Sequence, residues 1–147
     1  MRFFLAGIIQ GSHTGPLVHD QDYRRRIAER LREHIPTAEV YDPRANHPES
    51  VDYDDATGRR VFFGHNAMCR DVDVLVAFVP EASMGTAIEM WEAYQHGAAV
   101  IAISPMELNW AVRFLSHVIY ADVEQFEQAV QSGQLAEQIE DVLGKSA

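Results

Sequence analysis

The residues best suited to chemistry lie in one short stretch, Ser83-Met84-Gly85-Thr86, with Glu89 three positions later. If a helix begins near Gly85, Ser83 is near its N-cap, and the free N–H groups of the first turn favour a bound anion such as phosphate. Glu89 then lies in the second turn among apolar neighbours, where a carboxyl resists ionisation unless it has a partner. That property is usual for an acid, a base or a nucleophile. A capped helix with one buried, hydrogen-bonded glutamate would give the same pattern, so the residues alone leave both interpretations open.

A second polar stretch, Gly7–Gly15, follows the apolar run at the start of the chain. Its glycines and hydroxyl groups suit a backbone that wraps around a polar ligand, although a structural turn would have the same composition. The stretch has neither the Gly-x-Gly-x-x-Gly pattern of dinucleotide-binding proteins nor the Gly-Lys-Ser/Thr of a P-loop. Both of these nucleotide-binding classes are therefore excluded.

The elements that must position these residues can be predicted from apolar patterning. Compact apolar runs predict strands covered on both faces at Arg2–Ile9, Asp73–Val79 and Ala98–Ser104, with weaker strands at Ala38–Tyr41 and Val118–Tyr120. Apolar residues at helical spacing predict helices at Asp20–His34 (with arginines on its other face), Asp54–Asp71, Gly85–His96, Asn109–Ser116 and Val123–Leu143, the last interrupted near Ser132-Gly133. This order predicts a single domain over residues 1–147, an α/β doubly wound sandwich of about five parallel strands flanked by helices. Ligands bind at the carboxyl ends of such strands, where the polar stretches lie.

The chain is strongly acidic: 12 lysines and arginines stand against 22 aspartates and glutamates, a net charge of −10. This balance argues against binding to nucleic acid or to an anionic membrane, but it leaves a small phosphorylated ligand open. The one cysteine, Cys69, cannot form an internal disulfide, and the seven histidines lack metal-site spacing, so we expect no metal and no cofactor. The absence of a signal-like segment and of an apolar span of about 20 residues predicts a cytoplasmic protein.

An aspartate-led strand, Asp73-x-x-x-Ala77, leading into Ser83-Met84-Gly85-Thr86-x-x-Glu89, resembles the nucleoside 2-deoxyribosyltransferase superfamily. That group contains transferases that exchange bases on deoxyribose and the 2′-deoxynucleoside 5′-phosphate N-hydrolases. The opening Phe4-Leu5-Ala6-Gly7 is similar to the family's Tyr-Leu-Ala-Gly, and the resemblance covers residues 3–115, with Asp73–Ala93 its specific part. It implies a flavodoxin-like strand order, a small nucleoside or nucleotide as the ligand, and a homodimer or larger homo-oligomer.

The resemblance also implies roles for individual residues. Glu89 matches the nucleophile that attacks C1′ of the sugar and displaces the base, and negative charge there suits an oxocarbenium-like transition state. Ser83, with the amides of Gly85 and Thr86, matches the phosphate contacts of the nucleotide hydrolases, and a serine six residues before the glutamate favours that branch. Asn109 falls where family members lend a polar residue to the neighbouring subunit, which implies shared active sites.

Three polar positions depart from the family pattern. The tyrosine of the first strand is replaced by Phe4, a usual aspartate by His65, and an arginine of the first loop by Gln10. His65 would replace the missing acid by donating to a sugar hydroxyl or to Glu89, or by carrying a proton with a pKa near the working pH.

Three functions stay open on these residues. The preferred one is cleavage of the N-glycosidic bond of a nucleoside 5′-monophosphate, with Gly7, Gln10 and Ser12 of the first loop as further candidates for substrate binding. The alternatives are base exchange on unphosphorylated deoxynucleosides and a catalytically idle module that binds or senses a nucleotide.

The segment after the second predicted strand holds another polar cluster, Asp52-Tyr53-Asp54-Asp55. Asp54 or Asp55 is the expected N-cap of the following helix. Alternatively, Asp42, Asp52 or Tyr53 contacts the base or the sugar. The residues 42–48, with two prolines and no periodicity, predict an ordered surface loop near the pocket.

Overall fold

Five parallel strands form one sheet in the computed structural model, which describes residues 1–15 and 17–145. The strands are β1 (Arg2–Gly7), β2 (Glu39–Tyr41), β3 (Val74–Phe78), β4 (Ala99–Ile103) and β5 (Val118–Tyr120). Their order across the sheet is β2-β1-β3-β4-β5, and every neighbouring pair is parallel. This confirms the predicted α/β doubly wound fold and its flavodoxin-like strand order.

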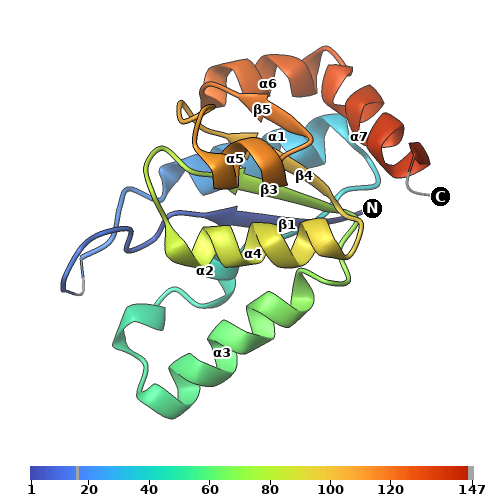
Figure 1. Cartoon of the computed structure of the whole chain (residues 1–147). Coiled ribbons are helices and arrows are strands. Elements are labelled where there is room, and N and C mark those ends of the chain that lie inside the picture. The colour runs from blue at the N-terminus through green and yellow to red at the C-terminus, as the bar shows by residue number, and fades with distance from the viewer. Residues whose placement is uncertain (16, 146–147) are drawn as a thin grey trace.

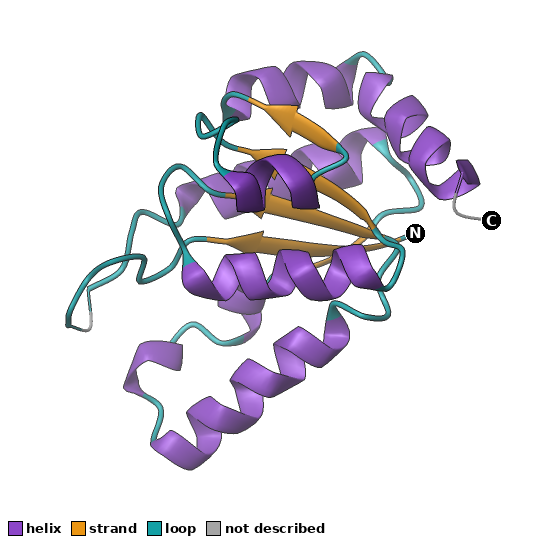
Figure 2. Cartoon of the chain, in the orientation of Figure 1, coloured by secondary structure: helices purple, strands orange, loops and turns teal. Residues whose placement is uncertain are grey.

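Helices cover both faces of this sheet (Figure 1). One face carries α1 (Asp22–His34), α6 (Val123–Gln131) and α7 (Gln134–Lys145), and the other carries α4 (Met84–Gln95) and α5 (Trp110–Leu115). The connection from β2 to β3 contains α2 (Pro43–Asn46), the 3-10 helix η1 (Ser50–Asp52) and α3 (Asp55–Met68). Figure 2 shows α3 standing apart from the strands, and its main packing partner is α4 rather than the sheet.

Alternate side chains of β1 enter two different cores. Phe3 and Leu5 pack with α1 and α6, whereas Phe4 and Ala6 pack with Met90 of α4, and each of the five is at most 1% exposed. Burying a large apolar side chain contributes about 1.5–3 kcal/mol relative to leaving it exposed. The strand that ends at the predicted site is therefore anchored firmly on both faces.

The segment between β2 and α3 differs from the prediction, because residues predicted as an irregular loop contain α2 and η1. Pro43 occupies the first turn of α2, where its missing N–H group would have had no helical partner. The Asp42 side chain caps this helix by accepting from the amide of Arg44 at 2.9 Å. A single helical turn is too short to repeat an apolar pattern, so patterning could not reveal it.

Two local features agree with the sequence analysis. Asp54 is the N-cap of α3, where its carboxylate accepts from the amide of Thr57 at 2.7 Å. The predicted interruption near residues 132–133 separates α6 from α7, and Gly133 has a φ of 82°, which favours glycine. Within the described ranges, we find no helix long and apolar enough to cross a membrane.

Candidate active site

A cavity of about 430 Å³ opens where β1 and β3 end, beside the switch in strand order. One wall consists of Gly7 and the loop after β1, together with the start of α4. The opposite wall comes from the connection between β2 and β3, from Pro43 in α2 to His65 in α3. Arg24 reaches the cavity from α1. The position agrees with the one expected for ligand binding in a doubly wound sheet.

The amino end of α4 presents backbone donors to this cavity. Ser83 is the N-cap of the helix, and its hydroxyl accepts from the amide of Thr86 at 3.5 Å and lies 2.8 Å from the Thr86 hydroxyl. In the described part of the chain, the amides of Met84 and Gly85 have no hydrogen-bond partner. A Cβ built at Gly85 would meet nothing within 4 Å, so the approach is open. Together with the helix dipole, these amides can hold an anion.

Glu89 lies one turn further along α4 and lines the same cavity. Its side chain is partly buried, and we find no hydrogen bond to its carboxyl group among the described residues. Burial raises the pKa of Glu89 to about 8, and the positive charge of Arg24 offsets only part of this rise. At pH 7 the carboxyl is therefore mainly protonated in the free protein, as a carboxyl in apolar surroundings should be.

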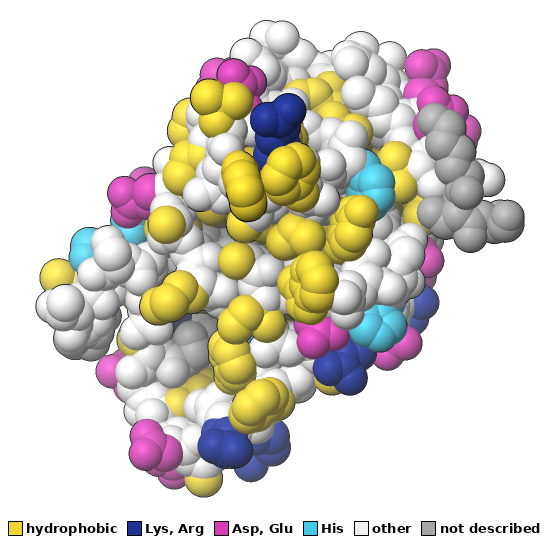
Figure 3. All heavy atoms as spheres, viewed as in Figure 1, with side chains coloured by type: hydrophobic (Ala, Val, Ile, Leu, Met, Phe, Trp, Pro, Cys, Tyr) yellow, Lys and Arg dark blue, Asp and Glu magenta, His cyan; other side chains and the backbone are white. Residues whose placement is uncertain are grey.

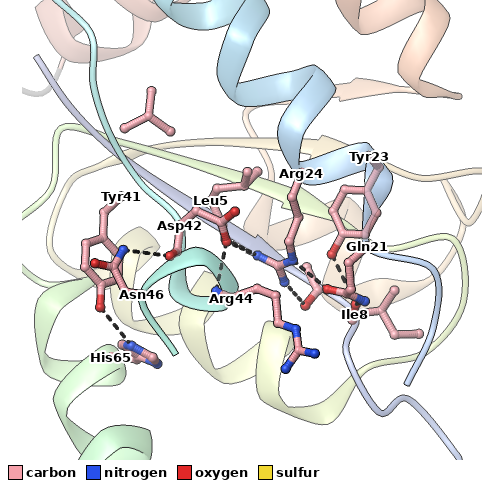
Figure 4. Close-up of polar contacts among 12 residues, drawn as sticks. Leu5, Ile8, Gln21, Tyr23, Arg24, Tyr41, Asp42, Arg44, Asn46 and His65 are labelled. Carbon is pink, nitrogen blue, oxygen red and sulfur yellow. Dashed lines mark hydrogen bonds and ion pairs between the residues drawn. The ribbon is translucent and has the colours of Figure 1, made fainter. Parts of the chain in front are cut away.

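Arg24 is a cavity residue that the sequence analysis placed on the solvent side of its helix. It is only 2% exposed and is held by four hydrogen bonds (Figure 4). Nη1 donates to the Leu5 carbonyl at 3.0 Å and to Asp42 Oδ1 at 3.0 Å, Nη2 donates to the Gly7 carbonyl at 2.8 Å, and Nε donates to Gln21 Oε1 at 2.7 Å.

The signal for this burial was present in the sequence. Arg24 precedes the buried residues Ala28 and Leu31 by four and seven positions, which places it on the apolar stripe of α1. A charged side chain on such a stripe must find partners inside the protein, because an unpaired buried charge is costly. Its partners are two backbone carbonyls of β1, the Asp42 carboxylate and the side-chain amide of Gln21.

His65 lines the cavity from α3, and its Nε2 atom lies 3.1 Å from the hydroxyl of Tyr41. Burial lowers the pKa of His65 to about 4, with His47 and Arg24 adding to the effect. The imidazole is therefore neutral at pH 7, and the expectation of a pKa near the working pH was wrong because the ring is desolvated. Phe4 stacks on Tyr41 with ring centroids 5.7 Å apart. The Tyr41 hydroxyl is hydrogen-bonded to His65 and makes no hydrogen bond to Glu89.

The structure brings seven of the nine predicted site residues to the cavity: Gly7, Gln10, His65, Ser83, Gly85, Thr86 and Glu89. Ser12 and Asn109 do not line it. Ser12 lies in the exposed turn beyond the cavity rim, and Asn109 is the N-cap of α5, where its Oδ1 accepts from the amides of Ala111 and Val112 at 3.0 and 3.4 Å.

Of the three candidates in the segment after β2, only one lines the cavity. Tyr53 lines the cavity, with its hydroxyl 3.0 Å from His47 Nδ1. Asp42 pairs with Arg24 instead of facing the cavity, and Asp52 does not line it. Within residues 1–15 and 17–145, no group of three or more histidine, cysteine, aspartate or glutamate side chains is arranged to hold a metal ion.

Neither a protein-family model nor a curated protein sequence matches the chain. Among solved structures, a 2-deoxyribosyltransferase from Bacillus psychrosaccharolyticus matches with a TM-score of 0.65 and 19% identity, over 86% of this chain and 90% of that one. The chain shares the fold of this structure. The resemblance noted in the sequence is therefore confirmed for the architecture.

Two other solved structures are also similar to this chain. A CMP N-glycosidase from Clostridium botulinum matches with a TM-score of 0.47 and 18% identity, over 90% of this chain and 99% of that one. An NADH:FMN oxidoreductase matches with a TM-score of 0.52 and 11% identity, over 98% and 89% of the two chains. A fold alone does not determine a reaction, so the residues in the cavity must decide the chemistry.

Proposed function

We propose that the protein cleaves the N-glycosidic bond of a nucleoside 5′-monophosphate, with Glu89 as the nucleophile. The observation that supports this most is the single cavity that contains both the Glu89 carboxyl and the unpaired amides of Met84 and Gly85. A helix N-terminus binds phosphate without a charged side chain, so the net charge of −10 is no obstacle. The similarity to a 2-deoxyribosyltransferase makes a nucleoside or nucleotide a reasonable substrate.

In the proposed reaction, a carboxylate oxygen of Glu89 bonds to C1′ of the sugar as the C1′–N bond breaks and its electron pair leaves with the base. The base takes up a proton from the solvent, and the water that attacks in the second step returns one. Water then attacks C1′ of the glycosyl ester, which releases the sugar 5′-phosphate and regenerates the carboxylate. The nucleophile must be ionised, and with a pKa of about 8 only about a tenth of the molecules meet this condition at pH 7. Activity should therefore rise with pH up to about 8.

The wall opposite Glu89 suits the base. Val61 and Phe62 of α3 supply apolar surface, and His47 and Tyr53 supply polar atoms at its edge. His65, being neutral, offers one donor and one acceptor. We therefore place the base against this wall and the sugar between the wall and Glu89.

One observation favours the alternative, base exchange on unphosphorylated deoxynucleosides. Among the described residues that line the cavity, Arg24 is the only lysine or arginine, and it is paired with Asp42 at 3.0 Å. Phosphate would thus be held by backbone amides and Ser83 alone. A nucleoside without phosphate makes no such demand.

We also propose that the chain forms a homodimer or a larger homo-oligomer. Large apolar side chains gather on the face formed by α3, α4 and α5 (Figure 3), and they include Trp91, 48% exposed, and Trp110, 76% exposed. Such contiguous apolar surface is usual at an interface. We call this the apolar face; its members are Phe63, Ile88, Trp91, Tyr94, Trp110 and Phe114. Asn109 adjoins Trp110, so a partner subunit on this face would bring the asparagine of one copy near the other.

The test is base release from a panel of nucleosides and their 5′-monophosphates, followed by chromatography. We expect wild type to release base from a monophosphate and Glu89→Gln to lose at least about a hundredfold of that rate. Ser83→Ala should raise KM for the monophosphate more than for the matching nucleoside. The control is Glu92→Gln on the same helix, whose carboxylate pairs with Arg70 at 2.8 Å and does not line the cavity.

Three results would separate the alternatives. Base exchange between free nucleosides, faster than any hydrolysis, would identify a transferase. A nucleotide that raises Tm without any base release by wild type would identify a binding module. Equal base release by wild type and Glu89→Gln would remove Glu89 from the mechanism.

A further inference from the structure

The cavity contains one unusual pair of charges. Arg24 and Glu89 are the only arginine, lysine, aspartate or glutamate side chains among the described residues that line it. Glu89 therefore depends on Arg24 for any stabilisation of its carboxylate form, since none of the described residues donates a hydrogen bond to it. A carboxylate in apolar surroundings needs such a partner.

Three other titratable groups near Glu89 are neutral at pH 7, and the remaining titratable groups that line the cavity, His47 and Tyr53, contact each other at 3.0 Å. Burial raises the pKa of the Tyr23 phenol on α1 and of the Cys69 thiol after α3, and it lowers the pKa of His65 on α3 to about 4. The segments of β1, β3 and β4 that pack on α4 contribute only apolar side chains, and Arg113 of α5 lies over the ring of Phe114. Glu92, one turn away on α4 itself, is paired with Arg70.

The charge of Arg24 is not wholly available to Glu89. Asp42, the residue after β2, accepts from Nη1 of Arg24 at 3.0 Å, and the side chains of Arg24 and Asp42 are only 3% and 13% exposed. Hydrogen bonds to the carbonyls of Leu5 and Gly7 hold the guanidinium in place (Figure 4). Because the Asp42 carboxylate lies against the same guanidinium, we expect its negative charge to offset part of the attraction between Arg24 and Glu89.

We propose that Asp42 is a positioning residue for Glu89: by pairing with Arg24, it decides how far that arginine can stabilise the carboxylate form of Glu89. Asp42 also caps α2 through the amide of Arg44. Asp42 therefore connects the charge of Glu89, on one wall of the cavity, with the folding of α2, on the other. Its importance for a nucleophile rests on the proposed function, whereas its effect on ionisation does not.

The experiment follows the protonation of Glu89 directly by infrared spectroscopy. The carbonyl band of the protonated carboxyl is assigned from the difference between wild type and Glu89→Gln and is then titrated with pH, without any substrate. In Asp42→Asn, the amide can keep both the cap and the contact with Arg24 while the negative charge is lost. We expect Glu89 in this variant to titrate about one pH unit lower than in wild type.

Two further variants make the result decisive. Glu49→Gln removes an equal charge from an exposed position of the same connection and should leave the titration unchanged. The double variant Arg24→Gln/Asp42→Asn lacks the positive charge of Arg24. Its Glu89 should therefore titrate at the same pH as in wild type or at a higher one. If water entered a loosened cavity instead, Glu89 would titrate at a lower pH than in wild type in both Asp42→Asn and the double variant.

The proposal is overturned if Glu89 titrates at the same pH in Asp42→Asn as in wild type. It is also overturned if Glu89 in the double variant titrates as low as in Asp42→Asn. If Asp42→Asn does not fold, Asp42→Ser takes its place, since serine also caps a helix and carries no charge. The outcome is independent of catalysis. A protein that releases no base can still show the expected titrations, and an active one can fail to show them.

Discussion

Replacing Glu89 with glutamine should stabilise the protein at neutral and alkaline pH, while removing the proposed nucleophile. The pKa of this carboxyl rises from its ordinary value of 4.5 to about 8 in the folded protein. Below pH 4.5 both the folded and the unfolded chain keep the proton, and the substitution changes little. As the pH rises toward 8, only the unfolded chain releases the proton, so wild type loses stability and the glutamine variant does not.

The size of the gain follows from the two pKa values. One pKa unit corresponds to about 1.4 kcal/mol, and the full rise corresponds to about 3 kcal/mol at pH 7 and about 5 kcal/mol at pH 9. Part of the Glu89 side chain faces the water-accessible cavity, which reduces this effect by screening. We therefore expect a gain of about 1–3 kcal/mol at pH 7, or about 3–10 °C in Tm for a domain of this length.

The assay is urea unfolding followed by circular dichroism, for both proteins, from about pH 4 to about pH 9. Glu92→Gln is the matched control on the same helix. The hydrogen bond from Arg70 lowers the pKa of Glu92, so this substitution should slightly destabilise the protein at neutral pH, the opposite sign. A gain at Glu89 of equal size at every pH would show a packing effect, and no gain at pH 7 would refute the reasoning about burial.

Three further predictions concern the scaffold. Gly7→Ala should cost about 1–3 kcal/mol in urea unfolding, because its Cβ would collide with the Tyr23 hydroxyl, and a cost near zero would contradict the packing described. Gly64→Ala, in the exposed middle of α3 with nothing within 4 Å of the new Cβ, should instead gain about 0.5–1 kcal/mol; a loss would show that α3 is not helical there. Trp110→Glu should convert a wild-type dimer or larger oligomer to monomers in sedimentation velocity, and a monomeric wild type would refute the proposed interface.

The sheet could be predicted from the sequence because its central strands are covered on both faces. β1, β3 and β4 read as unbroken apolar runs for that reason alone. The start of α1 could not be placed as well: a helix was predicted from Asp20, but it begins at Asp22. The side-chain Nε2 of Gln21 donates to the carbonyls of Ile8 and His19, so this residue is bound to the loop after β1 instead of starting the helix.

Some residues of the candidate site could likewise be predicted from local spacing, and others could not. Ser83 and Glu89 belong to one helix and its cap, so their spacing alone could place them together. The burial of Arg24 depends on carbonyls of β1 and on Asp42. The low pKa of His65 depends mainly on burial of the ring in the folded protein, with His47 and Arg24 adding to it. Helical spacing indicates only that Arg24 lies on the buried stripe of α1; its partners, and the surroundings of His65, come from elements distant in the sequence and exist only once the chain has folded.

The two walls of the cavity come from separate stretches of the chain. The wall with Ser83 and Glu89 belongs to β1, its loop and α4, which the sheet holds in place. The wall from Pro43 to His65 is a single insertion between two strands, and α3 packs mainly on α4. A connection grafted between Asp42 and Val74 should therefore change the ligand preference, while Asp42, Arg24 and the helix that carries Glu89 stay in place.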